Sequence, residues 1–418
     1  MKKRILSVFV IAITAVQFGY SQETKKDSEF GVKWGGYVKA DYILDTRRLN
    51  DTREGQYLVI PLGEKLDANG DDLNKELGYN QFAIESRLKA SFTGPDFLGM
   101  KTAGVIEAHF FGNSAKDING LALRHAYFTL SSDKVEWLFG QYWHPTFVTN
   151  VSPGVHAFTA GVPYQPFSRS PQVRFSTKGN VRFTAAIITE RDFTTASGRT
   201  EDYGGAAVRF AGIPTFHTQL QFGQDDKIVG GFGATLKTVD LNDRLGVNAL
   251  AKNDNKTSLS FMGYAKANLG QGVTWKVYGQ YGGNTTEQLM FGGYARKSNG
   301  DILDSKVLSA WTEFSGKFND KLGWGLFGGY TKDGGFGNDY ASLVKSSGVE
   351  NSYRISPRLD YTVGKVRLGA ELCYTTAQYA NVVGPDKVVV INSNGDLNTT
   401  GVNEVGNFRT ALSATYFF

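Results

Sequence analysis

The sequence predicts an all-β protein of one domain, a transmembrane antiparallel up-and-down β-barrel of 16 or 18 strands. Three observations support this prediction: an export signal, alternation of apolar and polar residues over long segments, and long loops that alternate with tight turns. A membrane-spanning helix needs about 18 consecutive apolar residues, and every apolar run after Gln22 is much shorter.

The composition excludes several classes of protein. Aromatic residues make up 13% of the 418 positions, which excludes a disordered chain. The single cysteine excludes a disulfide framework and a cysteine-rich zinc module. A net charge of +5 is too small over this length to indicate a nucleic-acid partner.

The N-terminus has the parts of a secretory signal peptide. Basic residues at 2–4 precede an apolar run over 5–16 that is too short to span a bilayer, and small residues precede Gln22. We therefore expect a cleaved signal peptide over 1–21 and a short periplasmic segment over 22–31, followed by the barrel over 32–418.

The C-terminal segment shows the alternation most clearly. One face carries Phe408, Thr410, Leu412, Ala414, Tyr416 and Phe418, and the other carries Arg409, Ala411, Ser413 and Thr415. Soluble strands usually have about five or six residues, so a period of two over this length is typical of an outer-membrane strand. Because assembly factors read a C-terminal aromatic residue, Phe418 predicts a contact with the barrel-assembly machinery.

The same alternation recurs over 32–42, 81–92, 172–178, 181–188 and 366–372, and helical spacing is sustained nowhere in the mature chain. A soluble β-sandwich or propeller also alternates and is the alternative fold. Strand length favours the barrel, and so do aromatic residues at strand ends, which suit a membrane interface: Trp34, Tyr42, Trp275, Tyr281, Trp324 and Tyr330.

Tight turns and long connections alternate along the chain. The tight turns are predicted at 131–133, 178–180, 212–214, 242–243, 319–320 and 363–365. The long loops are predicted over 44–79, 112–120, 143–170, 191–202, 282–306, 332–350 and 379–406. Short turns on one side and long loops on the other are typical of an outer-membrane barrel.

The strand faces opposite the apolar ones are mostly basic. They carry Lys39, Arg87, Lys89, Arg174, Arg182, Arg209, Arg244, Lys276, Arg354, Arg358, Arg367 and Arg409, against Asp41, Glu85, Glu107, Asp360 and Glu371. If these faces line the lumen, a cationic channel would attract anions. The alternative is that the arginines pair with lumen carboxylates and brace the wall.

Catalytic signatures are absent, so we expect no enzyme: there is no His-Glu-x-x-His, Gly-x-Ser-x-Gly or Walker sequence. The histidines have no mutual ligand spacing. Asp67, Asn69 and Asp71 surround a glycine turn and are weak candidates for Ca²⁺ ligands, as is the loop over 392–398, but the closing Glu is missing. We predict no other cofactor.

An ordered set of motifs resembles the DcaP-like outer-membrane porin family. The motifs are Gly36–Asp41, Asp45–Arg47, Glu85–Arg87, Glu107–Phe111, Leu123–Tyr127, Gly140–Trp143, Pro145, Phe147 and Arg169–Arg174. Together they cover roughly a third of the mature chain, and residues 200–418 match only in barrel pattern. The resemblance implies a homotrimeric barrel, usually of sixteen strands, that passes small anionic organic solutes through an arginine-lined constriction.

By position, the resemblance implies pore arginines at Arg87, Arg124, Arg169 and Arg174, and a segment over 143–170 that folds inward. Alternation instead places Arg124 on the lipid-facing side with its neighbours. The pore position that the resemblance implies and the lipid-facing position that alternation predicts therefore conflict at Arg124. Further constriction candidates are Arg182, Lys39, Glu107, Gln141 and Trp143.

The predicted function is passive diffusion of small anionic solutes across the outer membrane of a Gram-negative bacterium, with outer-membrane lipid as a further partner. One alternative is a phosphate-selective porin, which needs clustered lysine or arginine residues and a basic arm. Another is an outer-membrane enzyme such as a phospholipase, which needs a Ser–His pair on the outer surface. A third is a structural or adhesive barrel with a plugged lumen.

Overall fold

The computed structural model describes residues 30–50, 53–114, 116–158, 160–195, 205–224, 227–241, 255–296, 301–336, 343–383 and 388–418. The expected signal peptide, nearly all of the expected periplasmic segment, Arg244 and the turn predicted at 242–243 lie outside these ranges. No helix in the described part of the chain is long and apolar enough to cross a membrane.

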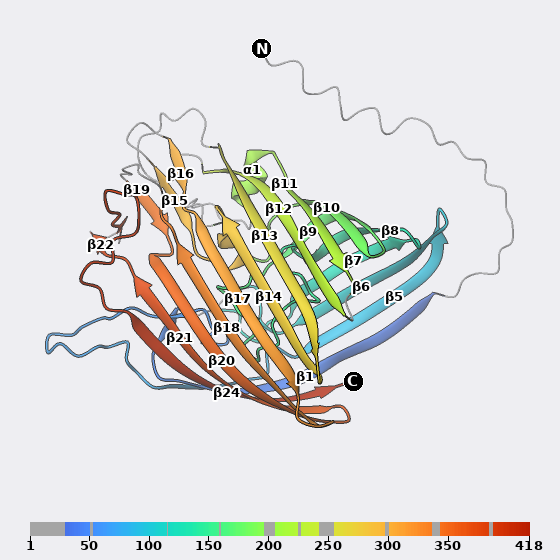
Figure 1. Cartoon of the computed structure of the whole chain (residues 1–418), viewed down its shortest axis with the longest axis horizontal. Coiled ribbons are helices and arrows are strands. Elements are labelled where there is room, and N and C mark those ends of the chain that lie inside the picture. The colour runs from blue at the N-terminus through green and yellow to red at the C-terminus, as the bar shows by residue number, and fades with distance from the viewer. Residues whose placement is uncertain are drawn as a thin grey trace, which may run out of the picture.

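One antiparallel sheet closes on itself and forms the barrel wall (Figure 1). Its strands are β1 (Gly31–Asp45), β4 (Gly78–Phe82), β5 (Arg87–Phe97), β6 (Met100–His109), β7 (Ala122–Ser131), β8 (Val135–Trp143), β9 (Arg169–Thr177), β10 (Val181–Ile188), β11 (Thr215–Gly223), β12 (Ile228–Asp240), β13 (Asn255–Gly270), β14 (Val273–Gly282), β17 (Val307–Lys317), β18 (Leu322–Asp333), β20 (Val349–Val363), β21 (Val366–Tyr379) and β24 (Val405–Phe417). Apart from β4 and β5, which both pair with β1, each strand pairs with its neighbour along the chain, and β1 pairs with β24 to close the ring.

The barrel has sixteen spanning strands, the lower of the two predicted numbers. The main sheet contains seventeen strands, but β4 and β5 are two halves of one spanning strand. Both halves pair with β1, β4 over Asp41–Asp45 and β5 over Gly31–Tyr37. The number eighteen is excluded because the other strand-like segments of the sequence lie in loops.

Short connections occur at one end of the barrel and long ones at the other, as predicted. The long connections contain β2 (Leu49–Asn50), β3 (Ile60–Pro61), α1 (Ala206–Ala211), η1 (Thr286–Gln288), β15 (Gly293–Arg296), β16 (Ile302–Asp304), β19 (Leu343–Ser346), β22 (Val382–Val383) and β23 (Val388–Val389). The tight turn predicted at 212–214 is wrong: Gly212, at φ 66°, caps α1 within a long connection. Arg209, which was expected on a strand, lies on α1 as well.

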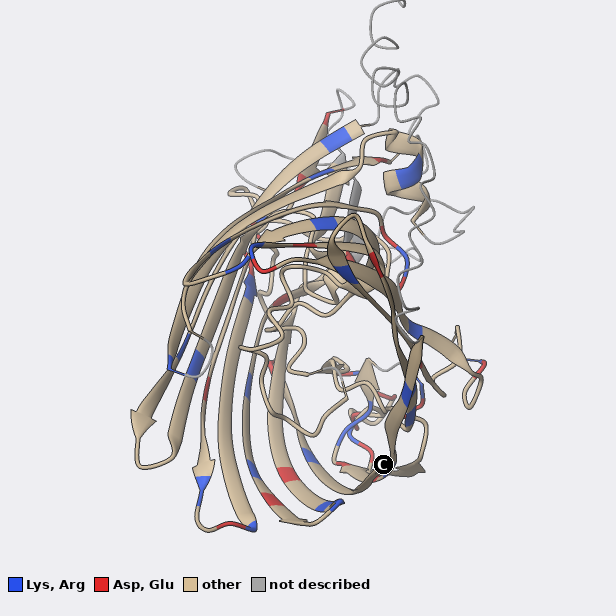
Figure 2. Ribbon diagram, turned by 90° about the vertical axis from the view of Figure 1, so that its right-hand side faces the viewer, with Lys and Arg blue, Asp and Glu red and all other residues tan. Residues whose placement is uncertain are grey.

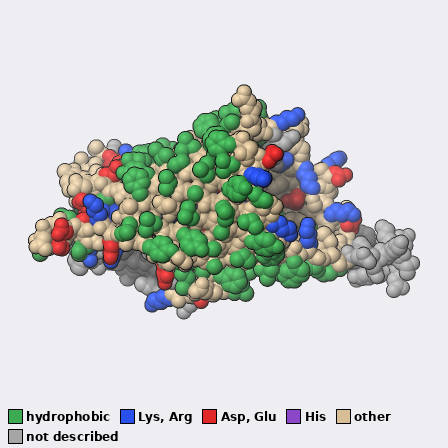
Figure 3. Space-filling view, turned by 90° about the horizontal axis from the view of Figure 1, so that it is seen from below, with side chains coloured by type: hydrophobic (Ala, Val, Ile, Leu, Met, Phe, Trp, Pro, Cys, Tyr) green, Lys and Arg blue, Asp and Glu red, His purple; other side chains and the backbone are tan. Residues whose placement is uncertain are grey.

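Side chains alternate between the outer and inner surfaces of the wall. On β24, Phe408, Leu412 and Tyr416 are exposed outward, whereas Arg409 and Thr415 are buried inside. Figure 3 shows hydrophobic side chains across the middle of the outer wall, with charged side chains towards both ends. The apolar faces of the sequence are therefore the outer faces, as a barrel in lipid requires.

Much of the buried apolar surface lies within the barrel, because long loops fold into the lumen (Figure 2). One aromatic cluster joins wall residues Ile43 and Phe82 to loop residues Tyr57, Phe111 and Phe158. Rings within it make close contacts, for example 3.9 Å between the centroids of Phe111 and Phe158. This cluster fixes the loops to one another on the long-loop side of the barrel.

The two faces of the wall predict which tryptophan side chains contact lipid. Trp34 is 63% exposed on the outer face, whereas Trp311 is 2% exposed within the lumen. In variants that keep one of these tryptophans, with Phe at the others, brominated lipids should quench Trp34 fluorescence much more than Trp311 fluorescence. Equal quenching of the two would contradict the assignment of faces.

A buried ion pair lies at the seam between the first and last strands. Arg409 binds both carboxylate oxygens of Asp45, at 2.9 and 2.7 Å. Removing one partner leaves a buried charge unpaired, so Arg409→Met should lower the free energy of unfolding by about 3 kcal/mol. Denaturant unfolding followed by gel mobility measures this change. Adding Asp45→Asn should recover part of the loss, and no recovery would show that packing, not charge, causes it.

Candidate functional site

A long segment between β8 and β9, residues 144–168, folds into the lumen and crosses it; we call it the inner loop. Its first part packs on β12 to β17, where Val148 and Val151 meet Tyr264 and Tyr278. Its returning part reaches β18 and β20, where the Tyr164 hydroxyl hydrogen-bonds Ser352 at 2.7 Å. The inner loop therefore lies mainly against β12 to β21. It also reaches β1, where Lys39 binds the His156 carbonyl at 3.3 Å and Ile43 belongs to the same cluster as Phe147 and Phe158.

Two adjoining cavities of about 390 and 500 Å³ lie between the inner loop and the wall. They share Phe147 and Thr149 of the inner loop. Charged side chains of the first cavity are Lys39, Arg87, Arg124, Arg367 and Glu85. Those of the second are Arg174, Lys178, Arg182 and Glu136. Seven basic residues therefore face two acidic ones across the combined space.

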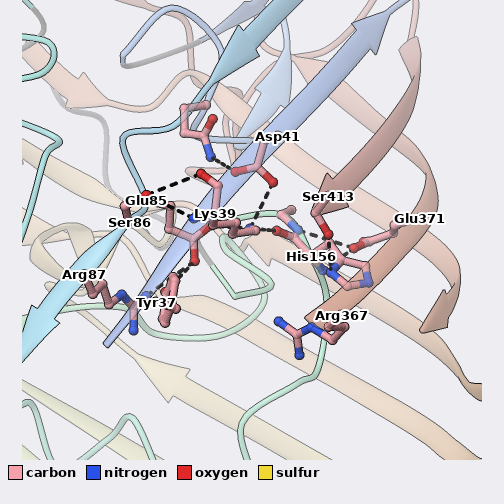
Figure 4. Close-up of polar contacts among 12 residues, drawn as sticks. Tyr37, Lys39, Asp41, Glu85, Ser86, Arg87, His156, Arg367, Glu371 and Ser413 are labelled. Carbon is pink, nitrogen blue, oxygen red and sulfur yellow. Dashed lines mark hydrogen bonds and ion pairs between the residues drawn. The ribbon is translucent and has the colours of Figure 1, made fainter. Parts of the chain in front are cut away.

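Lys39 and Glu85 form the centre of a charge network in the first cavity (Figure 4). The Lys39 ammonium also lies 3.1 Å from Asp41, so two carboxylates neutralise it. Arg87 is attached more loosely, at 3.5 Å from Glu85 and 3.6 Å from Glu107. Its guanidinium lies over the Tyr37 ring at 5.0 Å, which leaves it beside the cavity rather than behind it.

A β-bulge resolves the conflict over Arg124. On β7, His125 pairs with Glu107 of β6 and Leu123 pairs with Ala108, so Arg124 is the extra residue between them. The bulge turns Arg124 and His125 inward together, while Leu123 remains 51% exposed outside. Alternation was therefore wrong at this residue, which faces inward; the role of Arg124 as a pore arginine stays a prediction.

The Arg124 guanidinium is held without being fully neutralised. Its Nε lies 2.9 Å from Glu107, and the group stacks over the Trp143 ring at 5.1 Å. Its Nη1 has no hydrogen-bond partner within the described residues. Glu107 also lies 3.6 Å from Arg87, so one carboxylate serves two guanidinium groups beside the first cavity.

Arg169 also lies near Trp143, at 5.7 Å from its ring, but binds Asp192 through two nitrogens at 2.7 and 2.9 Å. This bidentate pair is almost fully buried, and Arg169 does not line either cavity. Its position is that of a brace at the loop end of β9. Trp143 itself stacks on Phe147 at 3.9 Å and lines the first cavity.

The remaining constriction candidates differ in whether they line a cavity. Arg174 and Arg182 line the second cavity, Arg174 with its Nε on Gln172 at 2.8 Å. Glu107 lies behind Arg124 and Arg87 as their shared counter-ion. Gln141 donates to the carbonyl of Arg124 at 3.2 Å and lines neither cavity, so it supports the bulge rather than facing the lumen.

Sequence reasoning missed several buried charges. Lys237 binds Glu190 at 3.1 Å and also Glu287 of η1, which ties a long loop to the wall. Burial raises the pKa of Glu287, although Lys237 opposes the shift. Alternation over 228–240 places Lys237 inward, so the pattern could have found it. Alternation did not identify Glu313 as an inward residue. Trp311, two residues earlier on the same face, is apolar and also faces inward, so the polar face of this strand could not be recognised.

His144 adds little positive charge to the lumen. His144, the first residue of the inner loop, binds the Thr146 hydroxyl at 2.8 Å. Burial, with His217 and Lys237 nearby, holds the pKa of His144 well below its ordinary value. Its ring is therefore neutral at physiological pH, and the basic excess comes from lysine and arginine.

The weak calcium candidates lie on an exposed hairpin. Asp67 Oδ1 accepts main-chain hydrogen bonds from Asn69 at 2.8 Å and Asp71 at 2.9 Å, and these bonds lower the pKa of Asp67. The carboxylate thus closes the turn. No group of three or more His, Cys, Asp or Glu side chains converges within the described ranges as a metal site would. Calcium binding by this hairpin stays an untested prediction.

No protein-family profile and no curated protein sequence matches the chain. Several solved structures match its fold. The outer membrane channel DcaP of Acinetobacter baumannii aligns with a TM-score of 0.68 at 17% identity, over 94% of this chain and 99% of that one. An anion-selective porin from Comamonas acidovorans aligns with a TM-score of 0.55 at 12% identity, over 93% and 100%. OmpT, an outer membrane protein of Vibrio cholerae, aligns with a TM-score of 0.53 at 11% identity, over 95% and 100%.

These likenesses show that the chain has the barrel fold of the outer-membrane porins. The predicted resemblance to the DcaP-like porins is confirmed at the level of the fold. A closed barrel with an apolar exterior is the form in which bacterial chains span the outer membrane, so the predicted location in a Gram-negative outer membrane is confirmed as well.

The bulge on β7 can be tested by cysteine accessibility. In a Cys373→Ser background, Arg124→Cys should react with a charged, water-soluble thiol reagent, because position 124 lines a cavity. Leu123→Cys, one residue away, should react only with a membrane-permeant reagent. The reverse pattern, or equal labelling, would show that β7 has no bulge at this position.

Proposed function

We propose that this protein is a passive porin for small, hydrophilic, anionic organic solutes, and that it is not an enzyme. One observation supports the anion preference most strongly. Seven lysine and arginine residues face two glutamates across the cavities beside the inner loop. A cationic surface in a confined, low-dielectric space raises the local anion concentration and speeds anion entry.

The chemistry of the basic residues favours carboxylates among the anions. Five of the seven are arginines, whose planar guanidinium binds a carboxylate through two hydrogen bonds. The alternative, that these groups only brace the wall, describes Arg169 well, since Asp192 binds it through two nitrogens and it lines neither cavity. It describes Arg124 and Arg87 poorly, because both line the first cavity and share Glu107, and Arg87 has only ion pairs of 3.5 and 3.6 Å.

The inner loop supplies the constriction in this proposal. It narrows the lumen to the space beside β1 to β11, where the basic residues lie. The aromatic cluster around Tyr57 and Phe158 fills another part of the lumen on the long-loop side. Solutes would then pass the arginines before or after this apolar region, which favours small molecules over large ones.

The proposed assembly is a homotrimer in outer-membrane lipid, inserted by the barrel-assembly machinery after cleavage of the signal peptide. The likeness to a trimer form of OmpT from Vibrio cholerae, at a TM-score of 0.52, supports the trimer. The main-chain amide of Phe418 donates to the Gly36 carbonyl at 3.2 Å, so the C-terminal residue lies at the seam between β1 and β24.

Charge reversal tests the anion preference. Arg87→Glu with Arg182→Glu changes the charge by two units in each cavity. At roughly 6 Å and an effective dielectric constant near 40, each change costs a passing monovalent anion about 3 kcal/mol before salt screening. The reversal potential in a salt gradient across a planar bilayer should therefore move from anion towards cation preference.

The control is Lys65→Glu, the same reversal on the exposed hairpin, which should leave the reversal potential unchanged. Replacing Arg87 and Arg182 by lysine should keep the anion preference and weaken block by small dicarboxylates. A charge-reversed protein that conducts with unchanged ion preference would refute the anion proposal. Absence of conductance in the unaltered protein would refute the porin itself.

A further inference from the structure

The far end of the inner loop, residues 152–157, is attached to the wall through its main chain; we call it the loop tip. The Gly154 amide donates to Glu313 at 2.7 Å, and the Ser152 carbonyl accepts from Lys276 at 2.9 Å. The amides of His156 and Ala157 both donate to one oxygen of Glu371. The loop tip has no sheet partner, so wall side chains satisfy its main-chain groups.

The two acceptors are deeply buried carboxylates. Glu313 is 0% exposed and also binds Arg358 at 2.7 Å, while Glu371 is 1% exposed. Both hydrogen bonds of Glu371 to the loop tip reach Oε2, and its Oε1 accepts from the Cys373 thiol at 3.0 Å. A hydrogen bond to a buried carboxylate is stronger than one to a neutral acceptor, which makes these contacts specific anchors.

Glycines in the wall provide space for two rings of the inner loop. A Cβ at Gly369 of β21 would lie 2.2 Å from Cε1 of His156, and one at Gly329 of β18 would lie 2.5 Å from the Tyr164 ring. Neither separation is possible for a real side chain, so each ring depends on the glycine beneath it. Gly328, next to Gly329, has open space where its Cβ would be.

The attached loop tip bounds the first cavity. Gly154, Val155 and His156 line it on one side, and Arg87 and Arg124 line it on the other. Figure 4 shows His156 between Lys39 on one side and Glu371 and Ser413 on the other, and the Lys39 ammonium donates to the His156 carbonyl at 3.3 Å. The position of the loop tip therefore depends on its contacts with β20, β21 and β24 and on this bond to β1.

We propose that Glu371 and Gly369, with Glu313 and Gly329, are positioning residues that hold the inner loop against the wall and thereby set the width of the pore. None of the four needs to touch a solute. The inference rests on the proposed porin function, because the width matters only if solutes pass. The loop tip would act as a fixed boundary of the lumen rather than as a freely moving gate.

Adding a methyl group beneath the loop tip tests the width directly. With Gly369→Ala, the His156 ring must retreat by about 1.5 Å to reach an ordinary contact distance. This retreat moves the ring into the first cavity and narrows the space beside Arg87 and Arg124. Single-channel conductance should therefore fall, with the anion preference unchanged. Gly328→Ala is the matched control and should conduct as the unaltered protein does.

Two substitutions at position 371 separate hydrogen bonding from charge. Glu371→Gln and Glu371→Leu both remove one negative charge, but only glutamine keeps an oxygen that can accept from the His156 and Ala157 amides. Glu371→Gln should therefore retain steady single-channel current. Glu371→Leu should show current that switches between levels, because the amides of His156 and Ala157 lose their acceptor and this part of the loop tip is held less firmly. Heat-modifiable gel mobility confirms that each variant has assembled.

The outcomes distinguish this inference from the function on which it rests. If the unaltered protein conducts with anion preference while Gly369→Ala conducts normally and the two position-371 variants behave alike, the positioning role is overturned and the porin stands. If the unaltered protein does not conduct, both fail. If Gly369→Ala does not assemble, the two variants at position 371 test the positioning role. Steady current in Glu371→Gln with switching current in Glu371→Leu supports it, and like behaviour of the two overturns it.

Discussion

Hydrocarbon offers no hydrogen-bond partner to main-chain N–H and C=O groups, and the architecture of this chain follows from that constraint. Every spanning strand pairs on both edges, and the ring is completed where β1 meets β24 in continuous register from Tyr37 with Phe417 to Asp45 with Arg409. Because the pleat then sends alternate side chains outward, lipid demands an apolar outer face and leaves the inner face available for polar residues.

The same constraint acts again inside the barrel. The inner loop crosses the lumen without sheet partners, and the wall supplies side chains that bind its main chain, above all Glu313 and Glu371. Acidic and basic residues of the inner surface therefore have different roles. Carboxylates on β17 and β21 are used to hold the loop, whereas basic residues on β5, β7, β9 and β10 remain beside the cavities. A nearly neutral chain can in this way present a basic passage, since much of its acidic charge is committed to structure.

Alternation predicted the outer and inner faces of most strands, and it failed where the backbone or the lumen departs from a regular pleat. At Arg124 an extra residue in β7 shifts the phase, and such a bulge leaves no signature in a period-of-two pattern. On β17, Trp311 faces inward because the inner loop covers it, which made that strand difficult to interpret. The strand number was predicted as 16 or 18 because alternation could not divide the segment near 282–306, where β15 and β16 lie in a long connection and not in the wall.

The sequence by itself determined that the chain forms a membrane barrel, because an apolar outer face must recur at every second residue and that pattern is local. It also determined which kinds of side chain face the lumen. Only the tertiary structure decided which basic residues bind a carboxylate of their own away from the cavities, such as Arg169, and which lie beside open space, such as Arg87 and Arg124. That distinction depends on contacts between distant segments, for example between His156 and Glu371, which are 215 positions apart. Alternation specifies the face on which a side chain lies, but the partner that meets it there is set by how the loops fold into the lumen.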